Sequence, residues 1–146
     1  MNKADFKKLQ SVQMEIMDEV HRVCTENNIL YYIIAGTALG AVRHGGFIPW
    51  DLDIDVAMPR SDYERFQKIC NEKMSDRFIC RNYKNTKGYL RPHALVCIKD
   101  TYLSTKSEKY NTNEQNLGIY LDVFPLDNAP DDVALREKQA EQIKKL

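Results

Sequence analysis

The chain has 146 residues, of which 43% are hydrophobic and 29% are charged, and its formal net charge at pH 7 is zero. This length fits one domain with a single core, and the composition is ordinary for a soluble globular protein. A neutral chain has no broad electrostatic footprint for nucleic acid or for an anionic membrane surface, so we predict no nucleic-acid partner.

From the sequence we expect neither a membrane span nor a signal peptide. Its longest nearly apolar run, residues 30–42, is too short to cross a bilayer and contains two Gly and a Thr. The four cysteines form no Cys-x-x-Cys pair and the three histidines are dispersed, so neither a zinc site nor a disulfide framework is indicated. Free thiols are typical of a reducing compartment, and we predict a cytoplasmic protein.

Apolar residues that recur every three or four positions predict a long first helix with a single apolar stripe. The stripe consists of Phe6, Leu9, Val12, Ile16, Val20 and Val23. Met14 and Met17 lie next to this stripe, and we interpret them as side chains that fill the core.

A short apolar run at residues 30–34 predicts a strand, and residues 38–44 predict a short helix after it. The strand enters the helix through Ala35, Gly36 and Thr37. Such a junction leaves free N–H groups at the helix start, and Gly36 has no Cβ to block a ligand. The junction therefore suits a phosphate, although a Gly-Thr turn alone is weak evidence.

Arg43 and His44 end this helix and precede the acidic segment that follows. They would add positive charge near a bound phosphate, or they would be solvated cations that complement the dipole at a helix C-terminus. The residues themselves leave both interpretations open.

The segment 50–59 alternates carboxylates with aliphatic side chains, and its carboxylates are Asp51, Asp53 and Asp55. Successive side chains of a strand point to opposite faces, so the three carboxylates would share one face. Three anions on one face repel each other unless a cation lies among them. The pattern therefore predicts a divalent-metal site, and ligands that are all oxygen favour Mg²⁺, Mn²⁺ or Ca²⁺ over zinc.

Two other interpretations of this segment fit less well. Solvated Asp residues on the wet face of a strand are unusual, because Asp is a poor strand former. An EF-hand loop that starts at Asp51 needs Gly at its sixth position and Glu at its twelfth, where this sequence has Val56 and Asp62.

The second half of the chain predicts one further helix that leads into several strands. Ser61 and Glu64 match a capping box that opens a helix ending at about residue 74. The remaining predicted elements are strands at 77–83 and 93–99, a polar loop at 111–116, a strand at 118–124 and a charged helix at 131–146.

Asp122 lies inside the apolar run 118–124, where a buried and unpaired carboxylate is costly. It is therefore a candidate third metal ligand, delivered from a strand next to the acidic one. Asp127 follows Pro125 and Leu126, and we interpret it as a turn or helix-cap residue.

These motifs closely resemble the LicD family of the nucleotidyltransferase-fold superfamily, which also includes fukutin and fukutin-related protein. The run from Ala35 to Asp55, AGTALGAVRHGGFIPWDLDID in single-letter code, carries most of the resemblance. The segments MPRSDYERF at 58–66 and LDVFPLD at 121–127 are similar to the next two blocks of the family. The resemblance covers roughly residues 6–130 in order, which makes it far more specific than any single motif.

The resemblance implies an α/β (α+β) fold, with a mixed nucleotidyltransferase-like sheet flanked by helices, as one domain over residues 1–146. It places the superfamily's phosphate-binding turn at Gly36 and Thr37. Its catalytic and metal-binding carboxylates, which would hold Mg²⁺ or Mn²⁺, map to Asp53, Asp55 and Asp122. Basic residues that would reach the donor's phosphates are Arg43, His44 and Lys99, although Lys99 is equally well explained as a lysine at a sheet edge.

Enzymes of this family transfer a phospho-alcohol, such as phosphocholine or a polyol phosphate, from a CDP-linked donor to a sugar of a surface glycan. The resemblance therefore implies a phosphotransferase with a donor such as CDP-choline and a glycan or glycolipid acceptor, through which it would contact a membrane peripherally. Two alternatives stay open, namely a nucleotidyltransferase that transfers the NMP group and a non-catalytic fragment that binds metal and nucleotide. A glycosyltransferase fits less well, because it would explain neither the Gly-Thr turn nor the third acid.

Two departures from the family pattern affect these expectations. Family members often have a further Asp where this chain has Leu52, but that side chain would point away from the metal face. Family members are also considerably longer, and little chain follows Asp122 to build an acceptor pocket. We therefore expect a truncated domain that binds Mg²⁺ and a CDP-linked donor but transfers slowly or not at all.

Overall fold

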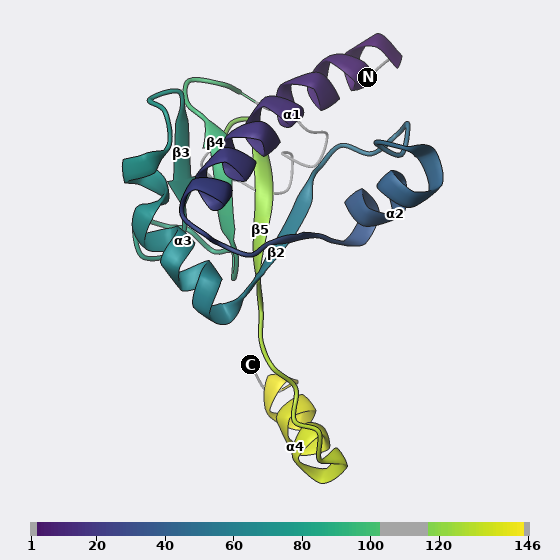
Figure 1. Ribbon diagram of the computed structural model, residues 1–146, viewed down its shortest axis with the longest axis vertical. Helices are drawn as coiled ribbons and strands as arrows, with labels where there is room; N and C mark the ends of the chain where they lie inside the picture. The colour runs from purple at the N-terminus through teal and green to yellow at the C-terminus, as the bar shows by residue number, and fades with distance from the viewer. Residues whose placement is uncertain (1–2, 103–116, 145–146) are drawn as a thin grey trace.

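The protein folds around a five-stranded mixed sheet (Figure 1). The computed structural model describes residues 3–102 and 117–144. The strands are ordered β1-β2-β5-β4-β3 across the sheet, and β2 and β5 are parallel whereas the other neighbours are antiparallel. Their bounds are Tyr32–Ile33 for β1, Asp55–Pro59 for β2, Phe78–Arg81 for β3, Ala94–Ile98 for β4 and Tyr120–Leu126 for β5.

Four described helices accompany the sheet: α1 at Lys3–Glu26, α2 at Ala35–His44, α3 at Arg60–Lys73 and α4 at Val133–Ile143. α1 and α3 cover one face of the sheet, α2 lies beside β2, and α4 projects away from the body (Figure 1). The α/β fold class and the long first helix predicted from the sequence are confirmed. Among the helices of the described ranges, none combines the length and the apolar character that crossing a bilayer requires.

The core lies between the sheet and the two helices α1 and α3. Alternate side chains of β2 and β5 face these helices and are fully buried, namely Val56, Met58, Leu121 and Val123. The predicted stripe of α1 contributes further buried side chains, among them Ile16, Val20 and Val23. Met17 packs against this core as predicted, but Met14 is 43% exposed, so its interpretation as a core side chain is wrong.

The acidic segment forms a regular strand only from Asp55 onward. Before it, the Asp51 N–H donates to the Ile48 carbonyl oxygen (2.9 Å) and closes a turn. The sequence predicted Asp53 on the strand itself, but the structure places it on the connection into β2, in agreement with Asp being a poor strand former. α2 likewise begins earlier than predicted, so Gly36 belongs to its first turn.

Ser61 and Glu64 do not form the predicted capping box. α3 begins at Arg60 directly after β2, and its N-cap is Pro59, which makes no side-chain cap hydrogen bond. Because the strand passes into the helix without a loop, Ser61 already lies inside the first turn of α3.

The other predicted elements agree with the structure in type and differ by a few residues in their bounds, as β3, β4, β5 and α4 show. The polar loop predicted at 111–116 lies outside the described residues. The cysteines are free, as the sequence predicted, and the structure also buries them: Cys24, Cys70, Cys80 and Cys97.

Candidate functional site

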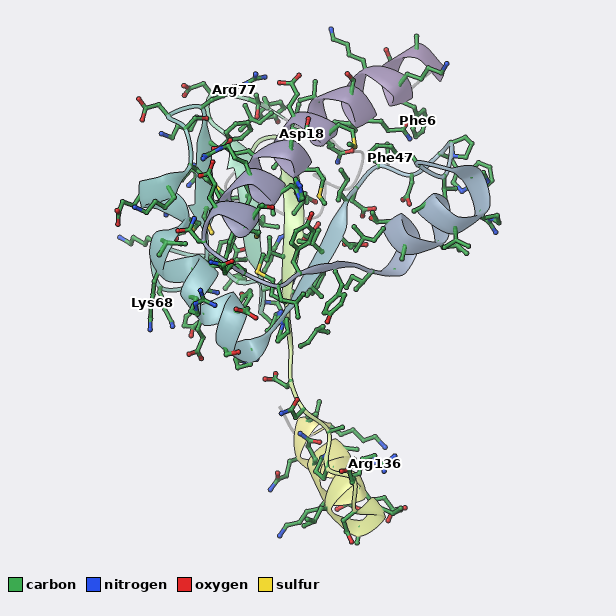
Figure 2. All side chains as sticks on the ribbon, in the orientation of Figure 1. Phe6, Asp18, Phe47, Lys68, Arg77 and Arg136 are labelled. Carbon is green, nitrogen blue, oxygen red and sulfur yellow. The ribbon has the colours of Figure 1, made fainter. Side chains whose placement is uncertain are left out.

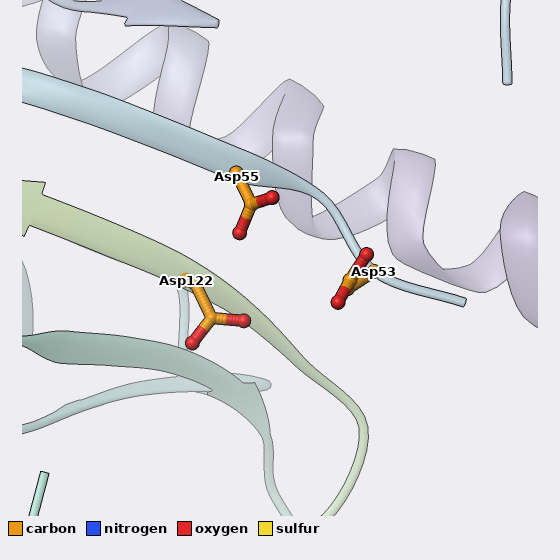
Figure 3. Close-up of side chains that lie close together, drawn as sticks. All are labelled: Asp53, Asp55 and Asp122. Atoms are coloured by element: carbon orange, nitrogen blue, oxygen red, sulfur yellow. The ribbon is translucent and has the colours of Figure 1, made fainter. Parts of the chain in front are cut away.

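Three carboxylate side chains lie close together (Figure 3). One comes from β2, one from β5 and one from the connection that leads into β2. Asp53, Asp55 and Asp122 each offer one oxygen atom, and these atoms all lie within 4.8 Å of one another. This separation falls within the roughly 3–6 Å expected of carboxylates that share one ion. The structure therefore brings together the three acids that the sequence singled out, which we call the acidic cluster.

The register of the sheet produces this convergence. β2 and β5 run parallel, and Asp55 and Asp122 are direct partners across them. The Asp122 N–H donates to the Ile54 carbonyl oxygen (2.9 Å), which fixes the register where β2 begins. Asp53 precedes Asp55 by two positions, and extended backbone therefore presents both side chains on the same side.

The three acids differ in burial, since Asp53 is exposed, Asp55 is half-buried and Asp122 is only 6% exposed. Partial desolvation of its carboxyl group by the neighbouring residues and the negative charge of Asp55 raise the pKa of Asp53 to about 6. Burial and the charge of Asp122 also raise the pKa of Asp55. The cluster thus resists full ionisation by itself, and a bound cation would remove that resistance.

The ligands of the acidic cluster fit a hard divalent cation. Carboxylate oxygens are the ligands that Mg²⁺ and Mn²⁺ prefer, and the cluster found within residues 3–102 and 117–144 offers neither a thiolate nor an imidazole. The donor set of the acidic cluster therefore suits Mg²⁺ or Mn²⁺ better than zinc.

The first turn of α2 is attached to the start of β2. The Thr37 hydroxyl oxygen accepts a hydrogen bond from the Asp55 N–H (2.9 Å), and the Ile34 N–H donates to the Asp55 carbonyl oxygen (3.1 Å). Ala35 has a left-handed φ of 48°, a strain of about 1–3 kcal/mol that is typical of functional turns. A helix leaves its first N–H groups without a partner inside the helix, so this turn presents donors beside the acidic cluster.

Asp51 is a fourth carboxylate at this place. A Cβ atom on Gly36 would lie 2.7 Å from the Asp51 Oδ2 atom, so only glycine allows this carboxylate to approach the helix start so closely. A side-chain hydrogen bond with Asp51 also contributes to the raised pKa of Asp53. Asp51 thus connects the first turn of α2 with the acidic cluster.

Three predicted phosphate-binding residues lie away from the acidic cluster. Arg43 and His44 are exposed in the last turn of α2, about 10–12 Å along the axis from Gly36 at about 1.5 Å per residue. There they complement the helix dipole, which favours the second of their two interpretations. Lys99 is exposed just after β4, and β5 separates β4 from β2. A contact of these residues with a donor phosphate stays a prediction.

Sequence reasoning missed two basic residues that contact the third carboxylate. The His93 Nε2 atom lies 2.7 Å from the Asp122 Oδ1 atom, and the Arg91 Nη1 atom lies 3.7 Å from the same oxygen. The ring of His93 lies against that of Phe124, with 4.2 Å between centroids. His93 and Arg91 thus provide the partners that a buried carboxylate requires.

Asp127 lies neither in a turn nor at a helix cap, so its interpretation as a turn or helix-cap residue is wrong. Its Oδ1 atom accepts a hydrogen bond from the Arg60 Nε–H (2.7 Å), and this partner lowers the pKa of Asp127. The N-cap of α4 is Asp132, whose side chain accepts a hydrogen bond from the Leu135 N–H. Asp127 therefore ties the end of β5 to the start of α3.

Comparison with known proteins places this site in a family. The model of the LicD/FKTN/FKRP nucleotidyltransferase domain matches residues 28–140, which include the acidic cluster, the first turn of α2 and both basic partners of Asp122. The chain belongs to the LicD family. α1 lies before the matched residues and supplies the LicD domain with one side of its core.

Three relatives are similar to parts of this chain, and one of them is itself named LicD. The lipopolysaccharide cholinephosphotransferase LicD of Haemophilus influenzae is 29% identical over 90% of this chain and 48% of its own length. An uncharacterized protein of Rickettsia prowazekii is 34% identical over 60% of this chain and 39% of its own. One from Rickettsia typhi is 47% identical over 38% of this chain and 18% of its own. The LicD domain described here thus spans less than half the length of these relatives.

Proposed function

We propose that this LicD domain carries the metal- and donor-binding site of a phosphotransferase. In the proposed reaction a phospho-alcohol, either phosphocholine or a polyol phosphate, passes from a CDP-linked donor such as CDP-choline to a sugar hydroxyl of a glycan or glycolipid. The observation that carries the proposal is the convergence of Asp53, Asp55 and Asp122 beside the first turn of α2. Similarity to a lipopolysaccharide cholinephosphotransferase supports this reaction class.

In this proposal different residues of the site bind the cation and the phosphate. The acidic cluster would hold Mg²⁺ or Mn²⁺, which when bound neutralises charge on the donor's phosphates. The N–H groups of Gly36 and Thr37 would bind one phosphate at the start of α2, where the helix dipole favours an anion. Arg91, whose Nη1 atom lies 3.7 Å from the Asp122 Oδ1 atom, would add positive charge beside the acidic cluster.

The acceptor side of the reaction requires a group that orients the sugar hydroxyl and takes up its proton. One of the clustered Asp side chains, or a residue beyond this chain, would supply that group. Catalysis of phosphoryl transfer consists largely of positioning and charge neutralisation. Binding of the cation and the donor is therefore the step of the proposed reaction that can be measured directly on this domain.

Calorimetric titration of the 146-residue chain with CDP, CDP-choline, CDP-ribitol and CDP-glycerol, each with and without Mg²⁺, tests the proposal. We expect binding that requires Mg²⁺ and that Asp55→Asn abolishes, because this variant removes a cation ligand at constant size. Asp18→Asn changes an exposed carboxylate of α1 and is the matched control (Figure 2). If none of these compounds binds, or if Asp55→Asn binds them like the unchanged chain, the proposal is wrong.

Incubation with CTP distinguishes the two enzymatic alternatives. A nucleotidyltransferase that transfers the NMP group would release pyrophosphate from CTP, whereas a phosphotransferase that uses a CDP-linked donor would release CMP from that donor. We expect no pyrophosphate above the level of the Asp55→Asn variant.

A further inference from the structure

A hollow of about 570 Å³ lies between the N-terminal part of α1 and the segment that joins α2 to β2. Its lining side chains are Phe6, Lys7, Gln10, Phe47, Pro49 and Trp50. Phe6 and Phe47 lie close together in this part of the molecule (Figure 2). The volume is within the range of about 300–1,000 Å³ that is usual for ligand pockets. We call this hollow the aromatic groove.

The aromatic groove exposes apolar side chains that a folded chain usually covers. Trp50 is the single tryptophan of the sequence, and its side chain is 68% exposed. Pro49 is exposed beside it, and Phe47 is half-buried. A contiguous apolar surface with polar residues among its lining is typical of a binding site.

The backbone that carries the Trp50 ring is attached to α1. The Gln10 Nε2–H donates to the carbonyl oxygens of Ile48 (3.3 Å) and Asp51 (3.0 Å), which lie on either side of Trp50 in the sequence. These two contacts fix the segment against the helix, so the aromatic groove is already formed in the folded chain.

The aromatic groove adjoins the acidic cluster. Trp50 directly precedes Asp51, and Asp51 forms a side-chain hydrogen bond with Asp53. Three residues of extended chain span at most about 11 Å, so the Cα atoms of Trp50 and Asp53 are no further apart than that. A ligand that covers the Trp50 ring can therefore extend to a group bound at the acidic cluster.

We infer that the aromatic groove binds a pyranose ring of the acceptor, with one C–H face of the sugar against the Trp50 ring. The inference rests on the proposed function and deepens it, because it assigns the acceptor to particular residues of this domain. The sequence led us to expect little chain for an acceptor pocket after Asp122, whereas the aromatic groove is built entirely from residues that precede the acidic cluster.

The chemistry of a pyranose matches the lining of the aromatic groove. The faces of the sugar ring carry apolar C–H groups, which can contact the aromatic side chains. Its hydroxyls surround the edge of the ring, and they keep water as a partner because the Trp50 side chain is largely exposed. A lipid surface fits less well, because Lys7 and Gln10 belong to the wall of a hollow, whereas a membrane-bound helix presents an uninterrupted apolar face.

Lys7 adds a preference for a charged sugar. Its side chain is exposed, and among the residues that the structure describes no ion pair of Lys7 is found. An anionic substituent on the sugar, such as a phosphate, would therefore gain a charge partner in the aromatic groove. An exposed pair of this kind raises affinity by about two- to fivefold.

The single tryptophan permits a test on the unchanged chain. In the presence of CDP and Mg²⁺, we expect the fluorescence of Trp50 to change in a saturable way with at least one of the methyl pyranosides of glucose, galactose, mannose and N-acetylglucosamine. Glucitol, which has hydroxyls but no rigid C–H face, should cause no such change. An absence of change with all four pyranosides, or an equal change with glucitol, would overturn the inference.

Two further ligands distinguish other occupants of the aromatic groove. If CDP displaces the pyranoside, the groove belongs to the donor and the inference is wrong. If vesicles of phosphatidylcholine and phosphatidylglycerol change the Trp50 emission and the pyranosides do not, the groove is a lipid-binding surface and the inference is also wrong.

Substitution of the ring tests the contact itself. We expect Trp50→Leu to reduce the affinity for the pyranoside by about two- to tenfold, measured by saturation-transfer NMR on the sugar protons, and to leave the affinity for CDP unchanged. Tyr83→Leu removes a ring that is 62% exposed and lies outside the aromatic groove, so it is the matched control. Equal affinities of the two variants for the pyranoside would contradict the stacking of the sugar on Trp50.

The same measurement with the 6-phosphate of that sugar tests Lys7, again with CDP and Mg²⁺ present. Lys7→Gln should lower the affinity for the sugar phosphate by about two- to fivefold and leave that for the neutral pyranoside unchanged. Lys8→Gln makes the same exchange at the next position of α1, outside the lining, and should change neither affinity. Equal effects of the two variants would overturn the assignment of Lys7.

Binding of CDP separates the inference from the proposed function. If CDP does not bind with Mg²⁺, the proposed function fails, and the aromatic groove loses its role as an acceptor site even if a pyranoside binds there. If CDP binds with Mg²⁺ but no pyranoside does, only the inference about the aromatic groove fails.

Discussion

The strands β2 and β5 present apolar side chains on one face of the sheet and carboxylates on the other. On the face that α1 and α3 cover, Val56, Leu121 and Val123 of β2 and β5 are completely buried among apolar side chains. On the other face, the intervening residues Asp55 and Asp122 stand side by side as register partners. Burial on the apolar face stabilises the fold, and this stabilisation offsets the repulsion between the carboxylates on the acidic face. Substitutions on the two faces should therefore have different signatures.

The largest effect on stability is expected on the apolar face. Phe66 is fully buried in the core, and Phe66→Ala should lower the free energy of unfolding by about 3–5 kcal/mol through lost burial and a cavity. Denaturant titration measures this change, and Mg²⁺ should not reduce it. Tyr83→Ala removes an aromatic ring that is 62% exposed and should cost about 0.5 kcal/mol or less. Similar losses for the two variants would contradict the assignment of the core.

A smaller effect is expected at the partner of the buried acid. His93→Ala removes the hydrogen bond to Asp122 and should lower the free energy of unfolding by about 1–3 kcal/mol in metal-free buffer. Added Mg²⁺ should restore part of the loss, because the cation would then compensate the carboxylate. His21→Ala is the matched control, since the His21 side chain has an exposed hydrogen bond to Tyr31 (2.8 Å). A loss in His93→Ala that Mg²⁺ leaves unchanged would show that the histidine serves packing alone.

Removing a charge from the acidic face should have the opposite sign. In metal-free buffer, Asp53→Asn and Asp55→Asn should leave the free energy of unfolding unchanged or raise it by up to about 1 kcal/mol, because clustered carboxylates repel each other. The melting temperature by circular dichroism measures this. A sharp fall in either variant would mean that the residue stabilises the fold instead of holding a cation.

The smallest expected effect is the pH dependence that Asp53 confers. Its pKa is about 6 in the folded chain and near 3.8 when unperturbed, so the folded state binds the proton more tightly. The contribution of this group to stability should therefore be lost as the pH rises from about 4 to about 6 in metal-free buffer. The difference in melting temperature between the unchanged chain and Asp53→Asn across this range isolates the contribution. A difference that does not vary with pH would contradict the raised pKa.

The acidic cluster could be predicted because alternation alone fixes which side a strand residue faces. Asp53 and Asp55 share a side in any extended backbone, and an acid inside an apolar run, as at Asp122, requires a partner. The direct register of Asp55 with Asp122 is a property of strand pairing, which no local pattern contains.

His93 and Arg91 were missed for the same reason. Both precede the strand β4, and their meeting with Asp122 follows from the pairing of β4 with β5, in which Leu95 is the partner of Asp122. Alternating basic residues that lead into a strand are the local signal that could have suggested them. The capping box at Ser61 failed for a different reason, because Pro59 joins β2 directly to α3 and leaves no room for a loop.

The hydrogen bond from the Asp55 N–H to the Thr37 hydroxyl would couple the proposed binding of a cation to the proposed binding of a phosphate. It joins the turn that would bind a phosphate to a residue that would bind a cation, at a distance of 2.9 Å. Linkage requires the coupling free energy to be mutual, so any factor by which the cation raises affinity for the donor is also the factor by which the donor raises affinity for the cation. Retention of the cation through a catalytic cycle would then depend on the nucleotide, and release of the nucleotide product would weaken the hold on the cation.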